Sequence, residues 1–107
     1  MWVKVCGIRN QSTAMLMAGL PDGDRPDAVG LNFYSGSRRC VELPTAESIV
    51  AVLDEVIEPV GLFVNAPLQQ VVSLQGELGL PTLQLHGEES PEYVAELQQV
   101  CTEVRIL

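Results

Sequence analysis

Four polar or reactive side chains stand where short apolar runs of the sequence end. They are Cys6, Asn32, Asn65 and His86. If these runs are parallel strands, the four side chains lie at one edge of a sheet, and the carboxyl ends of the strands are where parallel barrels place their chemistry. We therefore expect a polar site at this edge. The alternative is that residues such as Asn65 cap the helices that follow them.

Cys6 is the candidate base or nucleophile of this site. Lys4 shares its face of the predicted strand, because residues two apart point to the same side. A nearby cation favours the thiolate, and a thiolate can remove a proton as well as attack an electrophile. The alternative is that Cys6 is a small buried apolar side chain, as free cysteines commonly are. Cys40 and Cys101 are expected to pack without a chemical role.

Arg38 and Arg39 are the candidate anion-binding residues. They provide two of the six Lys and Arg residues, on a loop that contains Gly and Ser and directly follows a predicted strand. The planar guanidinium fork matches a carboxylate or a phosphate, although such a pair can also be a solvated surface feature. His86 could be a ligand, a base or a hydrogen-bonded strand-end residue. The sequence contains no metal-ligand cluster, phosphate loop or nucleophile elbow, so no metal or cofactor is predicted.

An alternation of strands and helices must position these side chains. The ranges predicted as strands are 2–6, 28–33, 60–64, 82–86 and 104–107. The ranges predicted as helices are 11–20, 44–56, 67–78 and 91–101. Short strands that alternate with helices form a parallel sheet with right-handed crossovers. The predicted fold class is therefore α/β, built from parallel (βα) units.

The alternation of side chains along each strand predicts which of them face the helices. Each strand has an aliphatic face that suits packing under helices, and an opposite face that ends in one of the four polar residues. In the third strand this pattern assigns Leu62 and Val64 to the helix side. It assigns Phe63 and Asn65 to the side of the expected site.

Charge and composition argue against several classes of partner. Fourteen Asp and Glu residues against six Lys and Arg residues give a net charge of -8, which argues against nucleic acid and against an anionic membrane surface. No apolar run reaches the roughly 18–20 residues that span a bilayer, and the start of the chain lacks the features of a signal peptide. Three cysteines at no metal-like spacing predict a cytoplasmic protein with free thiols.

The end of the sequence predicts an incomplete architecture. With 107 residues the chain is long enough for one compact domain, yet its last apolar run has no helix after it. The bare edge of a parallel strand is a template for further pairing. We therefore expect residues 1–107 to be a single partial barrel domain of four βα units and a fifth strand. A missing C-terminal half or a second copy in a homodimer would close its edges.

Several blocks of the sequence resemble those of phosphoribosylanthranilate isomerases. They are K-V-C-G-I at 4–8, D-A-V-G-L-N-F at 27–33, S-R-R at 37–39, G-L-F-V-N at 61–65 and L-Q-L-H-G-E-E at 83–89. The resemblance covers all 107 residues. Members of this family are (βα)₈ barrels of roughly twice this length, so the resemblance implies the first half of a TIM barrel.

The resemblance also implies a reaction. The family converts N-(5'-phosphoribosyl)anthranilate to its 1-deoxyribulose isomer by an Amadori rearrangement in tryptophan biosynthesis, without a metal or an organic cofactor. By motif match, Cys6 would be the general base that removes the proton from the sugar C2, and Arg39 would hold the anthranilate carboxylate of this phosphosugar substrate. Asn65, Gln84 and His86 would line the pocket.

Some functional groups of the family lie on strands beyond these blocks, and this predicts weak activity for this chain alone. The resemblance implies a general acid, an aspartate on a later strand, and phosphate-binding loops after strands seven and eight. We therefore expect little or no turnover from the 107 residues by themselves. One alternative is a non-catalytic half-barrel that self-associates or acts as an interaction module. Another is a flavodoxin-like binding domain, for which residues 7–10 make a poor phosphate loop.

Overall fold

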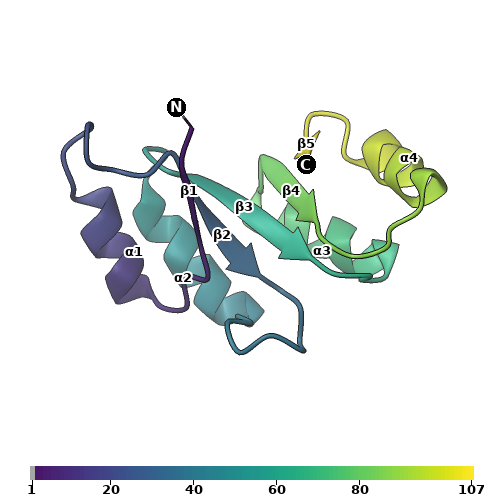
Figure 1. Ribbon diagram of the computed structural model, residues 1–107, viewed down its shortest axis with the longest axis horizontal. Coiled ribbons are helices and arrows are strands. Elements are labelled where there is room, and N and C mark those ends of the chain that lie inside the picture. Colours follow the sequence, from purple (N-terminus) through teal and green to yellow (C-terminus); the bar gives the residue numbers. More distant parts are fainter. Residues whose placement is uncertain (1) are drawn as a thin grey trace.

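A computed structural model describes residues 2–107 as one parallel sheet with helices between its strands (Figure 1). Neighbouring strands are all parallel, and their order in the sheet is β1-β2-β3-β4-β5. The elements in chain order are β1 (Lys4–Cys6), α1 (Gln11–Ala18), β2 (Ala28–Asn32), α2 (Leu43–Leu53), β3 (Glu58–Phe63), α3 (Leu68–Leu78), β4 (Thr82–Leu85), α4 (Pro91–Val100) and β5 (Arg105–Ile106). The predicted α/β class of parallel (βα) units is confirmed.

The main difference from the predicted elements is the end of the second helix. Helix α2 ends at Leu53, three residues before the predicted end. Asp54 and Glu55 adopt left-handed backbone angles, with φ of 50° and 61°, which a helix cannot continue through. Val56, the last apolar position of the predicted helix, is 42% exposed, whereas Ile57 beside it is buried in the core without being helical.

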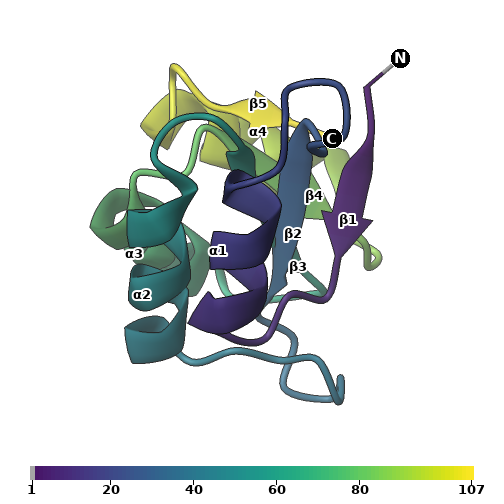
Figure 2. The same ribbon diagram turned by 90° about the vertical axis from the view of Figure 1, so that its left-hand side faces the viewer.

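The hydrophobic core lies between the helices and one face of the sheet. Figure 2 shows α1, α2 and α3 on the same side of the strands. The rings of Phe33 and Phe63 stack there, with their centroids 5.3 Å apart. The other buried members of this core include Val29, Leu31, Ile49, Leu53, Val71, Leu83 and Leu97. The opposite face of the sheet is thereby left to carry the polar side chains.

The strand register decides which side chains share that opposite face. Cys6 pairs with Gly30, Gly30 pairs with Val60, and Val60 pairs with Thr82. Two residues further along, Asn32, Leu62 and Gln84 form the next row. Partners in a parallel ladder point to the same side of the sheet. Both rows therefore lie away from the helices, toward what would be the inside of a barrel.

This register corrects the prediction for the third strand. Phe63, which was assigned to the side of the site, is 1% exposed and packs in the core under the helices. Leu62, which was assigned to the helix side, lies in the row of Asn32 and Gln84. The residues of this strand are apolar on both faces, so their alternation cannot indicate which face packs under the helices.

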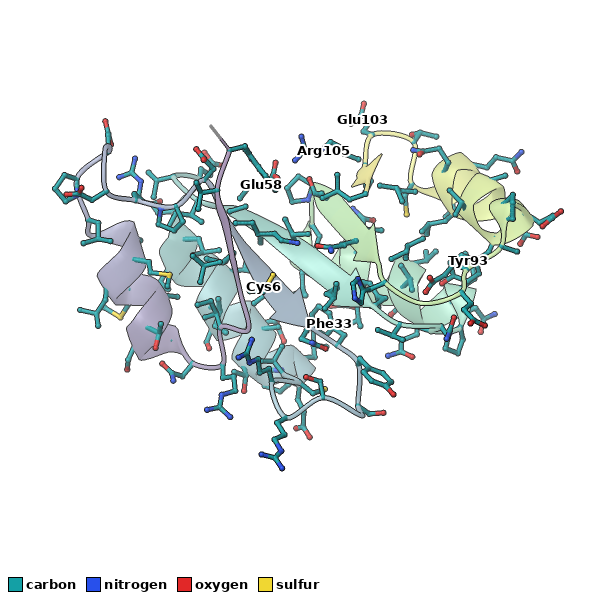
Figure 3. All side chains as sticks on the ribbon, in the orientation of Figure 1. Cys6, Phe33, Glu58, Tyr93, Glu103 and Arg105 are labelled. Atoms are coloured by element: carbon teal, nitrogen blue, oxygen red, sulfur yellow. The ribbon has the colours of Figure 1, made fainter. Side chains whose placement is uncertain are left out.

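The amino ends of the strands meet in a small cluster across the open face. The guanidinium of Arg105 lies 5.2 Å from the centre of the Trp2 ring and 3.0 Å from Oε2 of Glu58. Figure 3 shows Arg105 and Glu58 near this end, away from Cys6. The cluster connects β5 to β3 and to Trp2, two residues before β1, so it covers the end of the sheet that is remote from the predicted site.

None of the helices described within residues 2–107 is long and apolar enough to cross a membrane.

Candidate functional site

A cavity of about 420 Å³ lies at the carboxyl ends of β1 to β4. It contains the thiol-bearing residue, one imidazole and two guanidinium groups of the predicted site. Its lining residues are Cys6, Gly7, Gly30, Asn32, Ser37, Arg38, Arg39, Leu62 and His86. Three of the five residues predicted to form the site therefore meet around one cavity, namely Cys6, Arg39 and His86.

Cys6 is exposed at the wall of this cavity and has a free thiol. Figure 3 shows it near the carboxyl end of β1, on the side of β2. Its ladder partner is Gly30, and a Cβ atom at Gly30 would lie 3.2 Å from the Cys6 sulfur. A glycine at this position therefore leaves room for the thiol between the two strands. The thiol is open to a small molecule rather than packed as an apolar side chain.

Arg39 reaches the cavity by lying across the backbone of Gly7. Gly7 has φ of +81°, and a Cβ atom there would be 2.5 Å from Cδ of Arg39. A side chain at position 7 would thus suffer both an unfavourable backbone conformation and a steric clash. Gly7 directly follows Cys6 in the chain, and both line the cavity together with Arg39.

Asn32 and Ser37 hold the loop that carries the two arginines. The Asn32 side chain accepts a hydrogen bond from the Tyr34 amide at 2.8 Å and donates one to Oγ of Ser37 at 3.3 Å. Oγ of Ser37 also accepts from the amide of Arg39 at 3.1 Å. This role of Ser37 was not among those predicted from the sequence. The signal available was a serine two residues before Arg39, a spacing typical of side-chain-to-backbone turns.

Three of the six Lys and Arg residues gather at this end of the molecule. Arg38 and Arg39 line the cavity, and Nη1 of Arg9 donates to the carbonyl oxygen of Arg38 at 3.4 Å. The ion pairs found within residues 2–107 involve Arg25 and Arg105 instead. The cavity mouth therefore presents unneutralised positive charge in a chain of net charge -8, which favours a small anionic ligand at this place.

Gln84 lies in the same face of the sheet but outside the cavity lining. Its Oε1 atom is buried and has no hydrogen-bond partner among the described residues. A buried acceptor without a partner costs about 1–3 kcal/mol. Gln84 is the ladder partner of Leu62, which does line the cavity. Its amide oxygen is therefore a buried, unpartnered acceptor in the same row as a residue that lines the cavity.

Asn65 stands apart from the other predicted site residues. It leaves β3 in a left-handed conformation with φ of 50°. Its Oδ1 accepts from the Glu88 amide at 2.7 Å, and its own amide donates to Oε2 of Glu89, also at 2.7 Å. Helix α3 begins after Pro67 without a side-chain cap. Asn65 is therefore neither a lining residue of the cavity nor the cap of α3, and it joins two loops instead.

Tyr93 on α4 bonds to the loop after β3. Its hydroxyl donates to the carbonyl oxygen of Ala66 at 2.8 Å. Burial, and next the negative charge of Glu89, raise the pKa of Tyr93 above its ordinary value of 10.0. The folded protein thus holds this proton more tightly than the unfolded chain does. The contribution of Tyr93 to stability is complete below pH 10, and it is lost as the pH rises toward and through the folded-state pKa.

The raised pKa of Tyr93 predicts that the Tyr93→Phe variant loses less stability at alkaline pH than the wild type does. Between pH 9 and 11 the urea midpoint of the wild type should fall, because ionised Tyr93 cannot donate to Ala66. Tyr93→Phe should start from a lower midpoint at pH 7 and fall less over that interval. Tyr34→Phe, which changes an exposed tyrosine, is the matched control and should retain the wild-type slope. Equal slopes in all three proteins would contradict the assignment.

No group of three or more His, Cys, Asp and Glu side chains within residues 2–107 is placed to hold a metal ion.

Comparisons with known proteins agree on one family. Residues 3–107 match the family described as N-(5'-phosphoribosyl)anthranilate (PRA) isomerase. A curated relative, the N-(5'-phosphoribosyl)anthranilate isomerase of Azotobacter vinelandii, is 43% identical over 88 residues, which are 82% of this chain and 41% of that protein.

Solved structures of the same family have the same fold. A phosphoribosyl anthranilate isomerase in complex with reduced 1-(o-carboxyphenylamino)-1-deoxyribulose 5-phosphate (rCdRP) matches with a TM-score of 0.83 at 30% identity, over 99% of this chain and 51% of that chain. Monomers of the dimeric enzyme from Thermotoga maritima match with a TM-score of 0.80 at 29% identity, over 99% of this chain and 50% of that chain. The chain thus spans about half the length of these relatives.

Proposed function

Because the chain belongs to the phosphoribosylanthranilate isomerase family over residues 3–107, we propose that its cavity is part of an isomerase site. The substrate is N-(5'-phosphoribosyl)anthranilate, and the reaction is the Amadori rearrangement to 1-(2-carboxyphenylamino)-1-deoxyribulose 5-phosphate in tryptophan biosynthesis. The observation that carries the proposal is the meeting of Cys6, Arg39 and His86 around one cavity at the carboxyl ends of the strands.

In this proposal Cys6 is the general base. A general acid protonates the furanose ring oxygen as the ring opens, and the Cys6 thiolate removes the proton from the sugar C2. Two features support this role. The sulfur is exposed at the cavity wall, and Gly30 leaves space beside it. General acid–base steps of this kind contribute roughly 10²–10⁴-fold to a rate.

Arg39 binds the anthranilate carboxylate in this proposal. Its guanidinium lies over Gly7, next to Cys6, and it has no ion-pair partner within the described residues. A carboxylate can accept two parallel hydrogen bonds from such a fork, which fixes both its position and its orientation. The substrate's aromatic end would then be held near the thiol that acts on its sugar end.

For each of the other three predicted residues, a different observation supports a role in the site. His86 lines the cavity, and we propose that its imidazole contacts the substrate. Gln84 offers the unpartnered Oε1 described above, and we propose that it accepts a hydrogen bond from the bound molecule. Asn65 is engaged by the backbone of Glu88 and Glu89, so we propose that it supports the site through its loop.

The proposal places the general acid and the phosphate-binding loops outside these residues. The family pattern puts them on later strands, and the sheet described for residues 2–107 has five strands. We therefore expect weak ligand binding and little turnover from the 107-residue chain. The three free cysteines support a reducing compartment, and we propose a cytoplasmic location.

Binding of rCdRP tests the proposal without requiring turnover. We expect weak, saturable binding to the 107-residue chain, with NMR shifts confined to residues around Cys6, Arg39 and His86. Arg39→Gln should weaken binding about ten- to hundredfold, because a hydrogen-bonded charge is lost. Arg25→Gln is the control, since Arg25 pairs with Asp22 elsewhere. Absence of binding, or equal binding by both variants, would contradict the proposed site.

A second candidate is a half-barrel that functions by association. It is favoured by the sheet order, which leaves β1 and β5 as edges within the described residues. Such edges are templates for pairing with another strand. Sedimentation of the purified chain distinguishes the cases. A defined dimer would favour self-association as a function, and a heterogeneous aggregate would favour an unclosed part of the isomerase.

A further inference from the structure

The loops after β3 and β4 are joined by a set of hydrogen bonds centred on the Glu89 carboxylate. Its Oε2 accepts from the amide of Asn65 at 2.7 Å, and its Oε1 accepts from the amide of Gly87 at 2.9 Å. The Asn65 side chain accepts from the Glu88 amide at 2.7 Å in return. One carboxylate thus spans two loops that lie about two dozen residues apart in the chain. We call this set the Glu89 bridge.

The bridge depends on close contact between the two loops. Gly87 has no side chain, and a Cβ atom there would lie 2.6 Å from Oδ1 of Asn65 and 2.8 Å from its amide nitrogen. Asn65 adopts φ of 50°, a conformation that asparagine tolerates better than most residues. Hydrogen bonds from amides to a carboxylate are roughly twice as strong as neutral ones. The side chain of Glu89 is half-buried, so water competes with these bonds only in part.

Backbone hydrogen bonds hold the chain on both sides of His86, and the bridge provides the one on the carboxyl side. The His86 amide donates to the carbonyl oxygen of Phe63 at 2.9 Å, which extends the pairing of β4 with β3. The next amide, that of Gly87, is the one that Glu89 holds. No hydrogen bond of the His86 imidazole occurs within residues 2–107, so its position depends on the backbone. The imidazole nevertheless lines the cavity with Cys6 and Arg39.

We propose that Glu89 is a positioning residue for His86. Its carboxylate fixes the loop after β4 against the loop after β3, and this contact holds the imidazole at the cavity. The part of this inference that concerns substrate rests on the proposed function, whereas the placement of His86 by Glu89 does not. The Glu89 carboxylate bonds to the amides of Asn65 and Gly87, neither of which lines the cavity, so it acts through the peptide that follows His86.

The matched variants Glu89→Gln and Glu88→Gln test this role in the 107-residue chain. Each removes one negative charge from the same loop, but only Glu89 uses its carboxylate in the bridge. Glu89→Gln should speed hydrogen exchange at the Asn65 and Gly87 amides about tenfold, as expected for the loss of one charge-assisted bond. It should also shift the imidazole NMR signals. The chain contains one histidine, so these signals are unambiguous.

The same variants separate positioning from a purely structural role. Glu89→Gln should weaken rCdRP binding severalfold, and Glu88→Gln should match the wild type in every measurement. Faster amide exchange with unchanged imidazole signals would overturn the positioning role, and unchanged exchange would overturn the bridge itself. If no protein binds rCdRP but the imidazole signals still respond to Glu89→Gln, the proposed function fails and the positioning role stands.

Gly87→Ala provides a second route should Glu89→Gln fail to fold. It keeps the carboxylate and pushes the two loops apart through the contact with Asn65. The imidazole signals should move in this variant as well, while exchange at Val29 and Leu31 in β2 stays at the wild-type rate. Unchanged imidazole signals in a folded Gly87→Ala protein would overturn the proposal.

Discussion

Replacing Cys6 with alanine is expected to lower kcat by about 10²–10⁴-fold in a completed barrel, because a general base contributes that much to a proton transfer. The completed barrel is a fusion of this chain to the half of the Thermotoga maritima enzyme that the present residues do not match. That half would supply the proposed general acid and phosphate-binding loops. Turnover is followed by the decay of phosphoribosylanthranilate fluorescence, with substrate generated in situ.

The Cys6→Ala fusion should bind rCdRP with nearly unchanged affinity. In the proposed role of Cys6 the thiolate acts on a proton in the transition state, so its loss should appear in kcat more than in KM. Cys40→Ala is the matched control, since Cys40 is a half-buried cysteine outside the cavity lining. A Cys6→Ala fusion with kcat near that of the parent would refute the assignment of the base.

Gly7→Ala is expected to lower both folding stability and affinity for rCdRP. A side chain at φ of +81° costs about 1–2 kcal/mol, and its Cβ would displace the Arg39 side chain. We expect the urea midpoint to fall and rCdRP affinity to weaken about tenfold or more, which corresponds to at least one charged hydrogen bond.

Gly79→Ala separates the two causes. Gly79 follows α3 with φ of +63°, and nothing lies within 4 Å of a Cβ built there. This variant should lose a similar amount of stability and retain the wild-type affinity. In an Arg39→Ala background, Gly7→Ala should no longer affect binding, because the displaced guanidinium is already absent. A Gly7→Ala protein that binds rCdRP as tightly as Gly79→Ala would contradict the placement of Arg39.

The cavity residues differ in how far the sequence predicted their location. Cys6 and His86 were predicted at strand ends, and both line the cavity. Arg39 was predicted from a loop that follows a strand, and its approach to Cys6 depends on Gly7. These placements could be predicted from the sequence because a strand end and the loop that follows it are adjacent in the chain. Local sequence patterns are sufficient to place a residue that lies at the end of a strand or in the loop directly after it.

Asn65 and the third strand show where local patterns are insufficient. Asn65 follows a predicted strand, as His86 does, yet a left-handed turn directs it to Glu88 and Glu89. Phe63 and Leu62 exchanged the faces predicted for them, because a strand that is apolar on both sides has no directional signal. In both cases the outcome depends on partners more than twenty residues away.

By itself, the sequence determined the order and type of the elements. Two-residue and three-to-four-residue periodicities, interrupted by Gly and Pro, are properties of contiguous segments, and they predict strands and helices without knowledge of neighbours. The tertiary structure alone decided the strand register, the face that each strand presents and the joining of the loops after β3 and β4. Those features arise from hydrogen bonds and packing between distant segments. A one-residue change of register would reverse every face, so the cavity exists only once the strands have paired.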